Sequence, residues 1–181
     1  MRFQPTEIDG AFFIELDAHA DDRGMFARTF CEEVFAKAGA QMRIVQTNIS
    51  RNPKAGTLRG LHFQAPPYEE AKLIQCVRGR VFDVAVDLRQ HSPSFRRNVC
   101  TELTADGNRL FLIPKGCAHG FLTLEDNSDI LYYMGDAFVP GAGQGVRWND
   151  PAFKICWPAA PHLISERDAS YPDLDVAGRG R

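Results

Sequence analysis

Two histidines stand inside short runs that combine strand-forming residues with glycine, His62 in Arg59–Gln64 and His119 in Pro114–Phe121. Packing alone would favour an apolar side chain at either position. An imidazole titrates closest to neutral pH, and it can accept a proton from carbon or bind a metal. Two imidazoles in a β-rich interior therefore predict either acid/base chemistry or metal binding.

Only one of the two runs fits a metal-binding pattern. Pro114–His119 has the P-x-G-x-x-H form of the second cupin motif. The first motif of a metal cupin needs a His-x-His pair with a nearby glutamate, whereas this chain has His62-Phe63-Gln64. We therefore expect no metal site. A metal-dependent cupin enzyme, such as a dioxygenase or isomerase, remains the alternative from another class.

Length and composition indicate one soluble globular domain with a small-molecule partner. The 181 residues are 44% hydrophobic and 24% charged, with a formal net charge of −2, which gives no electrostatic reason to expect nucleic acid or a membrane surface as partner. No apolar run approaches the roughly 20 residues that span a bilayer. The N-terminus, Met1–Pro5, also lacks the apolar stretch of a secretory signal, so a cytoplasmic location is expected.

The cysteines are predicted to be free thiols, most of them buried. There are five, widely spaced and without a C-x-x-C pair. An odd number with such spacing argues against a disulfide framework and against a structural zinc site.

Alternation with a period of two dominates the chain and predicts an all-β fold, a sandwich or barrel. One helix is expected at Cys31–Gly39, with acidic residues at its start. The chain from Ala137 onward is rich in Pro, Gly and Asp, so residues 137–181 are predicted to form an irregular coat on a single domain, 1–181. The predicted strands are Phe12–Leu16, Met25–Phe30, Arg43–Ser50, Lys72–Val77, Arg80–Leu88, Asn98–Leu103, Arg109–Ile113, Gly120–Thr123 and Asp129–Met134.

Two predicted strands carry polar residues where a core is expected. Gln46 and Asn48 share one face of their strand, while Val45 and Ile49 lie on the other. A solvated outer face is one explanation, and amides directed into a ligand cavity are the other. Asp83 lies in an otherwise apolar strand and therefore needs a partner.

Eight runs in a fixed order give the chain from Asp21 to Asp168 a family resemblance. It resembles the dTDP-4-dehydrorhamnose 3,5-epimerase family, which implies a cupin-type jelly-roll barrel with one or two short helices. The runs are Asp22-Arg23-Gly24, Val45-Gln46-Thr47-Asn48, Leu58–Gln64, Lys72-Leu73, Phe82–Arg89, Ile113–Phe121, Trp148-Asn149-Asp150 and Ser165–Asp168.

The resemblance implies an isomerase that removes and returns protons beside the C4 ketone of a nucleotide-linked 4-keto-6-deoxy sugar. The main reading is 3,5-epimerisation of dTDP-4-dehydro-6-deoxyglucose without a cofactor. The alternative within this chemistry is a 3- or 5-mono-epimerase on another nucleotide sugar, CDP- or GDP-linked for example. A homodimer in which N-terminal strands cross between subunits is also implied.

Four catalytic roles are carried over with the resemblance. His62 matches the base, and Asp168 matches the carboxylate that fixes its tautomer and supports the imidazolium. Lys72 matches the cation beside the enolate oxygen. Tyr132 matches the proton donor on the opposite face; its rival, Tyr133, points to the other side of the strand. The alternatives to these catalytic roles are that His62 is a hydrogen-bonded core histidine, that Asp168 is a charged residue of the tail and that Lys72 is a solvated lysine.

The resemblance also implies a set of contacts to sugar, diphosphate and base. Arginines suit the diphosphate because the guanidinium donates two parallel hydrogen bonds to phosphate oxygens. His119 has a second possible role, as support paired with Asp83, and Arg23 a second role as a surface residue that caps a turn. The implied substrate-binding residues are Arg23, Arg28, Gln46, Asn48, Arg59, His119, Phe138 and Arg167.

Four positions depart from the family pattern. Arg28 stands where the family usually has a glutamate, and Phe138 where it has a stacking tyrosine. Gly143 replaces another usual glutamate, and Arg167 replaces a lysine. Most of these positions concern recognition of the nucleotide and outer sugar. The departures therefore leave the identity of the nucleotide and of the sugar undetermined, while the proposed acid/base residues are unchanged.

Overall fold

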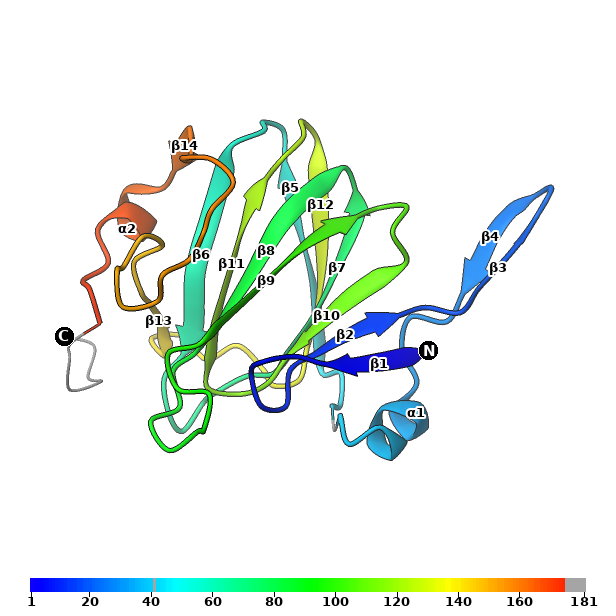
Figure 1. Ribbon diagram of the computed structural model, residues 1–181, viewed down its shortest axis with the longest axis horizontal. Helices are drawn as coiled ribbons and strands as arrows, with labels where there is room; N and C mark the ends of the chain where they lie inside the picture. Colours follow the sequence, from blue (N-terminus) through cyan, green and yellow to red (C-terminus); the bar gives the residue numbers. More distant parts are fainter. Residues whose placement is uncertain (41, 175–181) are drawn as a thin grey trace.

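Two mostly antiparallel sheets face each other in the computed structural model, which describes residues 1–40 and 42–174 (Figure 1). The first sheet has the strand order β1 (Arg2–Pro5), β2 (Phe12–Glu15), β10 (Arg109–Ile113), β7 (Lys72–Arg78), β12 (Ser128–Met134), β5 (Gln46–Asn52). The second has the order β13 (Gly143–Gly145), β6 (Thr57–Gln64), β11 (Cys117–Thr123), β8 (Arg80–Asp87), β9 (Asn98–Thr104). The predicted all-β jelly roll is confirmed.

Eight of the nine predicted strands appear close to their predicted places, one is shorter than predicted, and several strands, β1 and β6 among them, were not predicted. The segment Met25–Phe30 forms strand only over β4 (Gly24–Ala27), which pairs with β3 (Ala18–Asp21) in a separate hairpin. Strand β6, which carries His62, was not among the predicted strands. Its sequence, TLRGLHFQ, breaks the alternation at Arg59-Gly60, so the period of two is hidden there.

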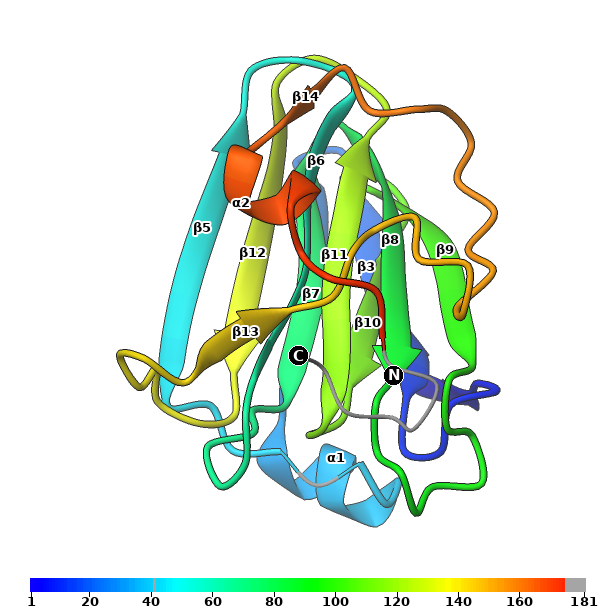
Figure 2. The same cartoon turned by 90° about the vertical axis from the view of Figure 1, so that its left-hand side faces the viewer.

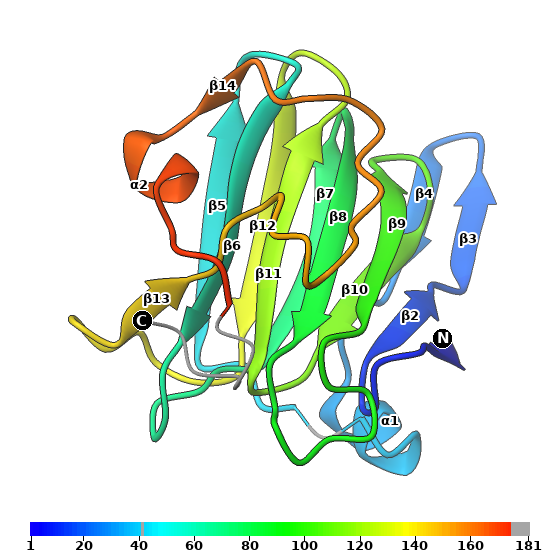
Figure 3. The ribbon, with the colours of Figure 1, turned by 60° about the vertical axis from the view of Figure 1, so that its left-hand side comes forward.

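Three apolar clusters account for the layers. The cluster between the sheets includes Ile74, Val81, Phe111, Phe121 and Ile130. A second cluster packs helix α1 (Glu32–Lys37) and the segments around it on the outer face of the first sheet. The third covers the outer face of the second sheet with the C-terminal coat, which crosses it in Figures 2 and 3. The predicted helix is therefore present, and the chain from Ala137 to Leu174 contains short elements of its own, while residues 175–181 of the predicted coat lie outside the described residues.

Those elements attach the end of the chain to strand β6. Strand β14 (Leu163–Ile164) pairs in parallel with the start of β6, and β13 pairs with its end. Helix α2 (Glu166–Ala169) follows β14 and lies beside the stretch of β6 that neither strand covers (Figure 2). Residues far apart in the sequence thereby meet at the middle of β6.

Glycines allow the backbones of β6 and β11 to touch next to the two histidines. Gly60 has φ +133°, and a Cβ there would lie 2.5 Å from the Cα of Gly120. No other residue fits such an approach without moving a strand. His62 and His119 are register partners immediately beyond this contact, so their side chains share one face of the second sheet.

The β3–β4 hairpin projects from the barrel on the side away from α2 (Figure 1). Arg23 lies in its turn, and Met25 and Phe26 on β4 are 54% and 76% exposed. The hairpin pairs with no other strand of the described chain. Its apolar side chains are left uncovered in a single copy.

Two simpler expectations concern cysteines and membrane spans. All five cysteines are free, as predicted, but only Cys76 and Cys117 are buried, so the expectation that most of them are buried is wrong. Over residues 1–40 and 42–174 no helix has both the length and the apolar character needed to cross a bilayer.

Candidate active site

His62 and Asp168 form a hydrogen-bonded pair at the middle of β6. His62 Nε2 lies 2.8 Å from Asp168 Oδ1, and the Gly60 N–H donates to Asp168 Oδ2 at 3.1 Å. Ser165 caps helix α2 by accepting the Asp168 N–H at its Oγ. Asp168 is buried, whereas the His62 side chain is 41% exposed and open to a ligand.

The Asp168 carboxylate is held in its ionised form. Burial on its own would raise the pKa of Asp168, but the hydrogen bonds from His62 and from the Gly60 N–H outweigh it and lower the pKa below its usual value. An ionised carboxylate only accepts hydrogen bonds, so the proton between the two groups belongs to His62 Nε2. The lone pair of His62 is then on Nδ1.

Lys72 reaches from the first sheet to the backbone carbonyl of His62. Its Nζ donates to the His62 carbonyl oxygen at 2.9 Å and lies 3.0 Å from Glu70 Oε1. The lysine is buried, which lowers the pKa of its ammonium group, while Glu70 opposes this shift. This hydrogen bond holds the Lys72 ammonium group close to the backbone of His62.

Tyr132 stands on the first sheet and faces the histidines of the second. Its ring meets that of His119 edge to face, with centroids 5.7 Å apart. His119 Nε2 in turn lies 2.9 Å from Asp83 Oδ1, so the partner expected for Asp83 is present. Tyr133 points to the outer face and donates its hydroxyl to Gln75, which confirms the opposite orientation of the two tyrosines.

Buried groups around Tyr132 keep its phenol protonated. Burial raises the pKa of Tyr132, the Asp83 carboxylate raises it further, and Arg59 opposes them. Burial also raises the pKa of Asp83, against the influence of His119 and Lys72. A phenol in such surroundings carries a proton at neutral pH and is able to give it up only beside a cation.

The polar face of β5 lies on the same side of the first sheet as Tyr132. Asn48 is the register partner of Tyr132, and Gln46 is the partner of Met134, which is paired on its other side with Lys72. The Gln46 amide donates to Asn48 Oδ1 at 3.1 Å. Of the two alternatives left open for these amides, the register agrees with the one that directs them inward, with Val45 and Ile49 facing out.

Arg59 is oriented by a buried asparagine. Its Nε donates to Asn52 Oδ1 at 2.7 Å, and the Asn52 amide donates to the Ser128 carbonyl at 2.9 Å. Arg59 itself is exposed. The arrangement leaves the other guanidinium nitrogens available to an anionic ligand.

Phe138 and Arg167 converge on Gly143. A Cβ at Gly143 would lie 3.9 Å from Arg167 Nη2 and 4.0 Å from Phe138 Cε2. The Phe138 ring is exposed, and the backbone N–H of Phe138 donates to Gln46 Oε1 at 3.3 Å. Three of the four departures from the family pattern are thus neighbours in space.

Arg23 and Arg28 lie apart from the other predicted residues. In its own chain Arg23 binds Asp21, donating from Nε to Oδ2 at 3.1 Å, as a turn-capping arginine does. Arg28 is exposed and follows strand β4. The single chain therefore brings together ten of the twelve predicted site residues and leaves these two on the hairpin and at its base.

Sequence reasoning missed several residues that hold the site. Glu70 and Asn52 are buried polar residues that belong to no motif. Tyr171 packs its ring 6.1 Å from that of His62 and over Gly145, where a Cβ would meet it at 2.2 Å. Ser165 offered a recognisable signal, a helix cap three residues before Asp168.

The described residues contain no group of three or more His, Cys, Asp or Glu side chains arranged to hold a metal ion. Gln64, at the position of the second histidine of a metal cupin, instead fastens a loop. Its Oε1 accepts the Val139 N–H at 2.7 Å, and its amide donates to the carbonyls of Tyr68 and Ala137.

A jelly roll with His62 on one sheet and with Lys72 and Tyr132 on the other has the architecture of a carbohydrate epimerase of the cupin class. A family model described as dTDP-4-dehydrorhamnose 3,5-epimerase matches residues 5–175. The chain belongs to the dTDP-4-dehydrorhamnose 3,5-epimerase family, whose members are isomerases that need no cofactor.

Similar proteins support the assignment over nearly the whole chain. The dTDP-4-dehydrorhamnose 3,5-epimerase of Shigella flexneri is 40% identical over 164 residues, 90% of each chain. The crystal structure of the Bacillus anthracis enzyme with TDP and PPi bound matches with a TM-score of 0.91 and 38% identity, covering 96% of this chain and 99% of that one. ChmJ of Streptomyces bikiniensis, a 3'-monoepimerase in complex with dTDP-quinovose, matches with a TM-score of 0.86 and 33% identity, covering 93% and 86%.

Proposed function

We propose that this protein epimerises dTDP-4-dehydro-6-deoxyglucose at C3 and C5, with His62 as the base and Tyr132 as the acid. The observation that carries the proposal is their placement on facing sheets. A carbon is inverted when its proton leaves on one side of the ring and another arrives on the opposite side. A base and an acid on opposite walls do this without turning the substrate over.

Proton removal falls to His62 Nδ1, because Nε2–H is donated to Asp168. As Nδ1 takes the proton from carbon, an imidazolium forms beside the ionised carboxylate, which stabilises it. The exposed side of the ring gives the sugar access to Nδ1.

Lys72 supplies the positive charge that the enolate needs. Loss of a proton next to the C4 ketone moves negative charge onto the C4 oxygen. A fixed ammonium group near that oxygen lowers the cost of the charge, and more so in a poorly hydrated cavity. The hydrogen bond from Lys72 to the His62 carbonyl keeps base and cation at a constant separation.

Tyr132 completes the inversion by returning a proton to carbon on its own side. Burial keeps the phenol protonated until the carbanion forms. Arg59 favours the phenolate, so it eases the transfer when the proton leaves. His119 supports the tyrosine ring rather than the sugar, since its Nε2 is taken by Asp83.

The remaining residues are suited to hold the nucleotide diphosphate. Arg59, oriented by Asn52, offers a planar donor pair to phosphate oxygens. Gln46 and Asn48 present amides to the sugar. Phe138 has an exposed ring that can stack on a base, with Arg167 next to it.

Deuterium exchange tests the proposed reaction. The protein is incubated with dTDP-4-keto-6-deoxyglucose in deuterated water, and NMR locates the label. Deuterium at both C3 and C5 is expected, and none in His62→Ala. Label at one carbon alone would make this chain a mono-epimerase, as ChmJ is. No label at either carbon would overturn the dTDP proposal, and exchange in a folded His62→Ala variant would overturn the choice of base.

We further propose that two copies form a homodimer through the hairpin and the uncovered outer face of the first sheet. Val45, Ile49 and Val77 are exposed there, with no segment of the described chain over them. Met25 and Phe26 are apolar groups of matching kind on the hairpin. Burying both surfaces against a second copy removes them from water.

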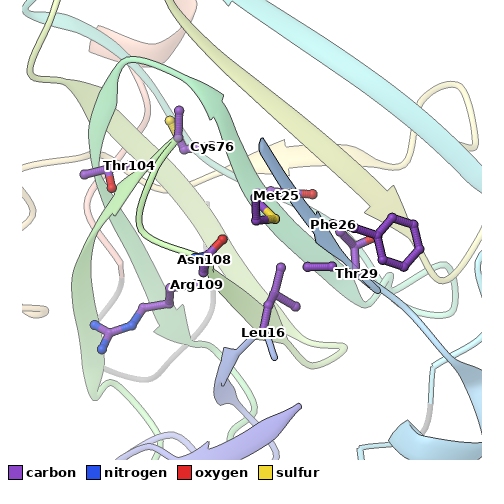
Figure 4. A pocket seen from close by; sticks show the side chains of 11 residues that line it. Leu16, Met25, Phe26, Thr29, Cys76, Thr104, Asn108 and Arg109 are labelled. Carbon is purple, nitrogen blue, oxygen red and sulfur yellow. The ribbon is translucent and has the colours of Figure 1, made fainter. Parts of the chain in front are cut away.

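The base of the hairpin leaves room for such a partner. A cavity of about 230 Å³ opens between the hairpin and the barrel, lined by Met25 and Phe26 from one side and by Cys76, Asn108 and Arg109 from the other (Figure 4). Since Arg23 projects away from its own His62, its proposed contact with phosphate would be made in the site of the second copy. Sedimentation velocity is expected to give a dimer; a monomer at assay concentration would contradict this.

The proposed compartment is the cytoplasm. A nucleotide-linked sugar carries a charged diphosphate and does not cross a bilayer unaided. Cell fractionation followed by the exchange assay is expected to recover the activity with the cytoplasmic fraction, and activity confined to another compartment would contradict this.

A further inference from the structure

The ammonium group of Lys72 has two protein partners, and both are fixed. It donates to the His62 carbonyl at 2.9 Å and forms an ion pair with Glu70, with Nζ 3.0 Å from Glu70 Oε1. The lysine and glutamate side chains are only 6% and 9% exposed. An ammonium group has three N–H donors. One N–H is held by the His62 carbonyl and Glu70 lies against the charge from another side, so an N–H remains for a ligand, with no further hydrogen-bond acceptor for it among residues 1–40 and 42–174.

Burial alone would favour the neutral amine, so something must keep this lysine charged. Three titratable groups act on it: Glu70 before β7, Asp83 on β8 and Cys117 on β11. Burial raises the pKa of Cys117 to about 12, so the thiol is neutral at physiological pH. Asp83 is bonded to His119. Glu70 has the largest influence of the three and is the group in direct contact.

We propose that Glu70 is a positioning residue that keeps Lys72 as an ammonium ion and directs its third N–H toward the C4 oxygen of the substrate. Glu70 does not touch the sugar in this arrangement; it acts through the lysine. The proposal rests on the proposed function, because Lys72 is the cation beside the enolate. It predicts that the charge of Glu70, and not only its shape, determines the pH range of the enzyme.

Titration of the lysines by NMR tests the charge directly and needs no substrate. The chain has five lysines, and the four others, Lys37, Lys54, Lys115 and Lys154, are exposed. In protein labelled at lysine Cε, Glu70→Gln is expected to move the titration midpoint of Lys72 down by about one pH unit or more. The neighbouring control, Glu69→Gln, is expected to leave it unchanged. An unchanged midpoint in folded Glu70→Gln would overturn the proposal.

Kinetics test the consequence for catalysis. Because Lys72 acts as a cation, a lower midpoint means that kcat falls at a lower pH on the alkaline side. Glu70→Gln is expected to shift this limb by the same amount as the NMR midpoint, with KM at neutral pH within about twofold of wild type. A shift in KM with an unmoved kcat profile would instead indicate a structural role and overturn the proposal.

Glu70→Asp separates charge from position and serves even if Glu70→Gln proves too unstable to purify. It keeps the carboxylate but draws it back by one methylene. Lys72 is expected to titrate within about half a pH unit of wild type, while kcat falls about fivefold or more because the third N–H is misdirected. Unchanged kcat, or a midpoint lowered as in Glu70→Gln, would overturn the proposal. If wild-type protein shows no deuterium exchange, the proposed function fails, and the NMR titration still decides the role of Glu70.

Discussion

The pair formed by His62 and Asp168 gives the sharpest prediction about the reaction. Asp168→Asn replaces a carboxylate that accepts from two donors, His62 Nε2 and the Gly60 N–H, with a group of the same shape. An amide has only one oxygen. Either its NH₂ faces the Gly60 N–H, donor against donor, or it donates to Nε2 and forces the proton onto Nδ1. The second arrangement removes the lone pair that the base needs.

The magnitude follows from the geometry. A unit charge pair at 2.8 Å attracts by about 6 kcal/mol at an effective dielectric constant of about 20, and the 41% exposure of His62 reduces this. Hydrogen bonds to charged groups contribute about 1.5–3 kcal/mol net, which is about ten- to 150-fold in rate. The wrong tautomer adds to this loss, so kcat should fall by about 10³-fold or more.

The assay is the rate of deuterium entry at C3 and C5 under single-turnover conditions, with Glu166→Gln as the control. Glu166 is an exposed carboxylate in the same short helix, so its variant should react within about twofold of wild type. Thermal unfolding of both variants checks that the barrel is intact. Exchange by folded Asp168→Asn at a rate within about fivefold of wild type would refute the reasoning, because His62 would then not depend on its partner.

Three further predictions test the acid, the diphosphate contact and the dimer. With Tyr132→Phe, the substrate should still exchange deuterium on the His62 side, but inverted product should form about 10²–10³-fold more slowly. Equal loss of exchange and of inversion would mean that Tyr132 is needed for deprotonation. Asn52→Ala should raise KM about tenfold with a smaller change in kcat, because Arg59 loses its orientation, and an unchanged KM in steady-state kinetics would exclude this role. Phe26→Asp, at a position 76% exposed, should leave the folded monomer within about 0.5 kcal/mol of wild type yet abolish the dimer in sedimentation; a persistent dimer would place the interface elsewhere.

Regular strands made part of this site predictable from the sequence. The alternation in β5 and β8 is uninterrupted, so the period of two places Gln46 and Asn48 on one face of their strand and puts Asp83 on a face with apolar neighbours. A buried carboxylate must be satisfied, so the sequence also indicates that Asp83 has a partner. These inferences needed no family resemblance, whereas His119 was considered as that partner only together with the resemblance.

Other parts depend on contacts that no local pattern records. Strand β6 was missed because the glycine that lets it approach β11 also breaks its alternation. Glu70 lies in a loop, where sequence gives no direction for a side chain. The hairpin separates Arg23 from His62, although the resemblance placed both in one site. A motif states that residues act together, but only the fold shows whether one chain can bring them together.

The bond between His62 and Asp168 joins residues 106 positions apart, and this has a consequence for synthesis and heat sensitivity. A ribosome must release nearly the whole chain before the base acquires its partner. Once made, the partner sits on a helix of four residues, of which only Asp168 is buried. Such an end can detach by local opening while the sheets stay folded. Activity should therefore disappear on warming before the barrel melts, and return on cooling.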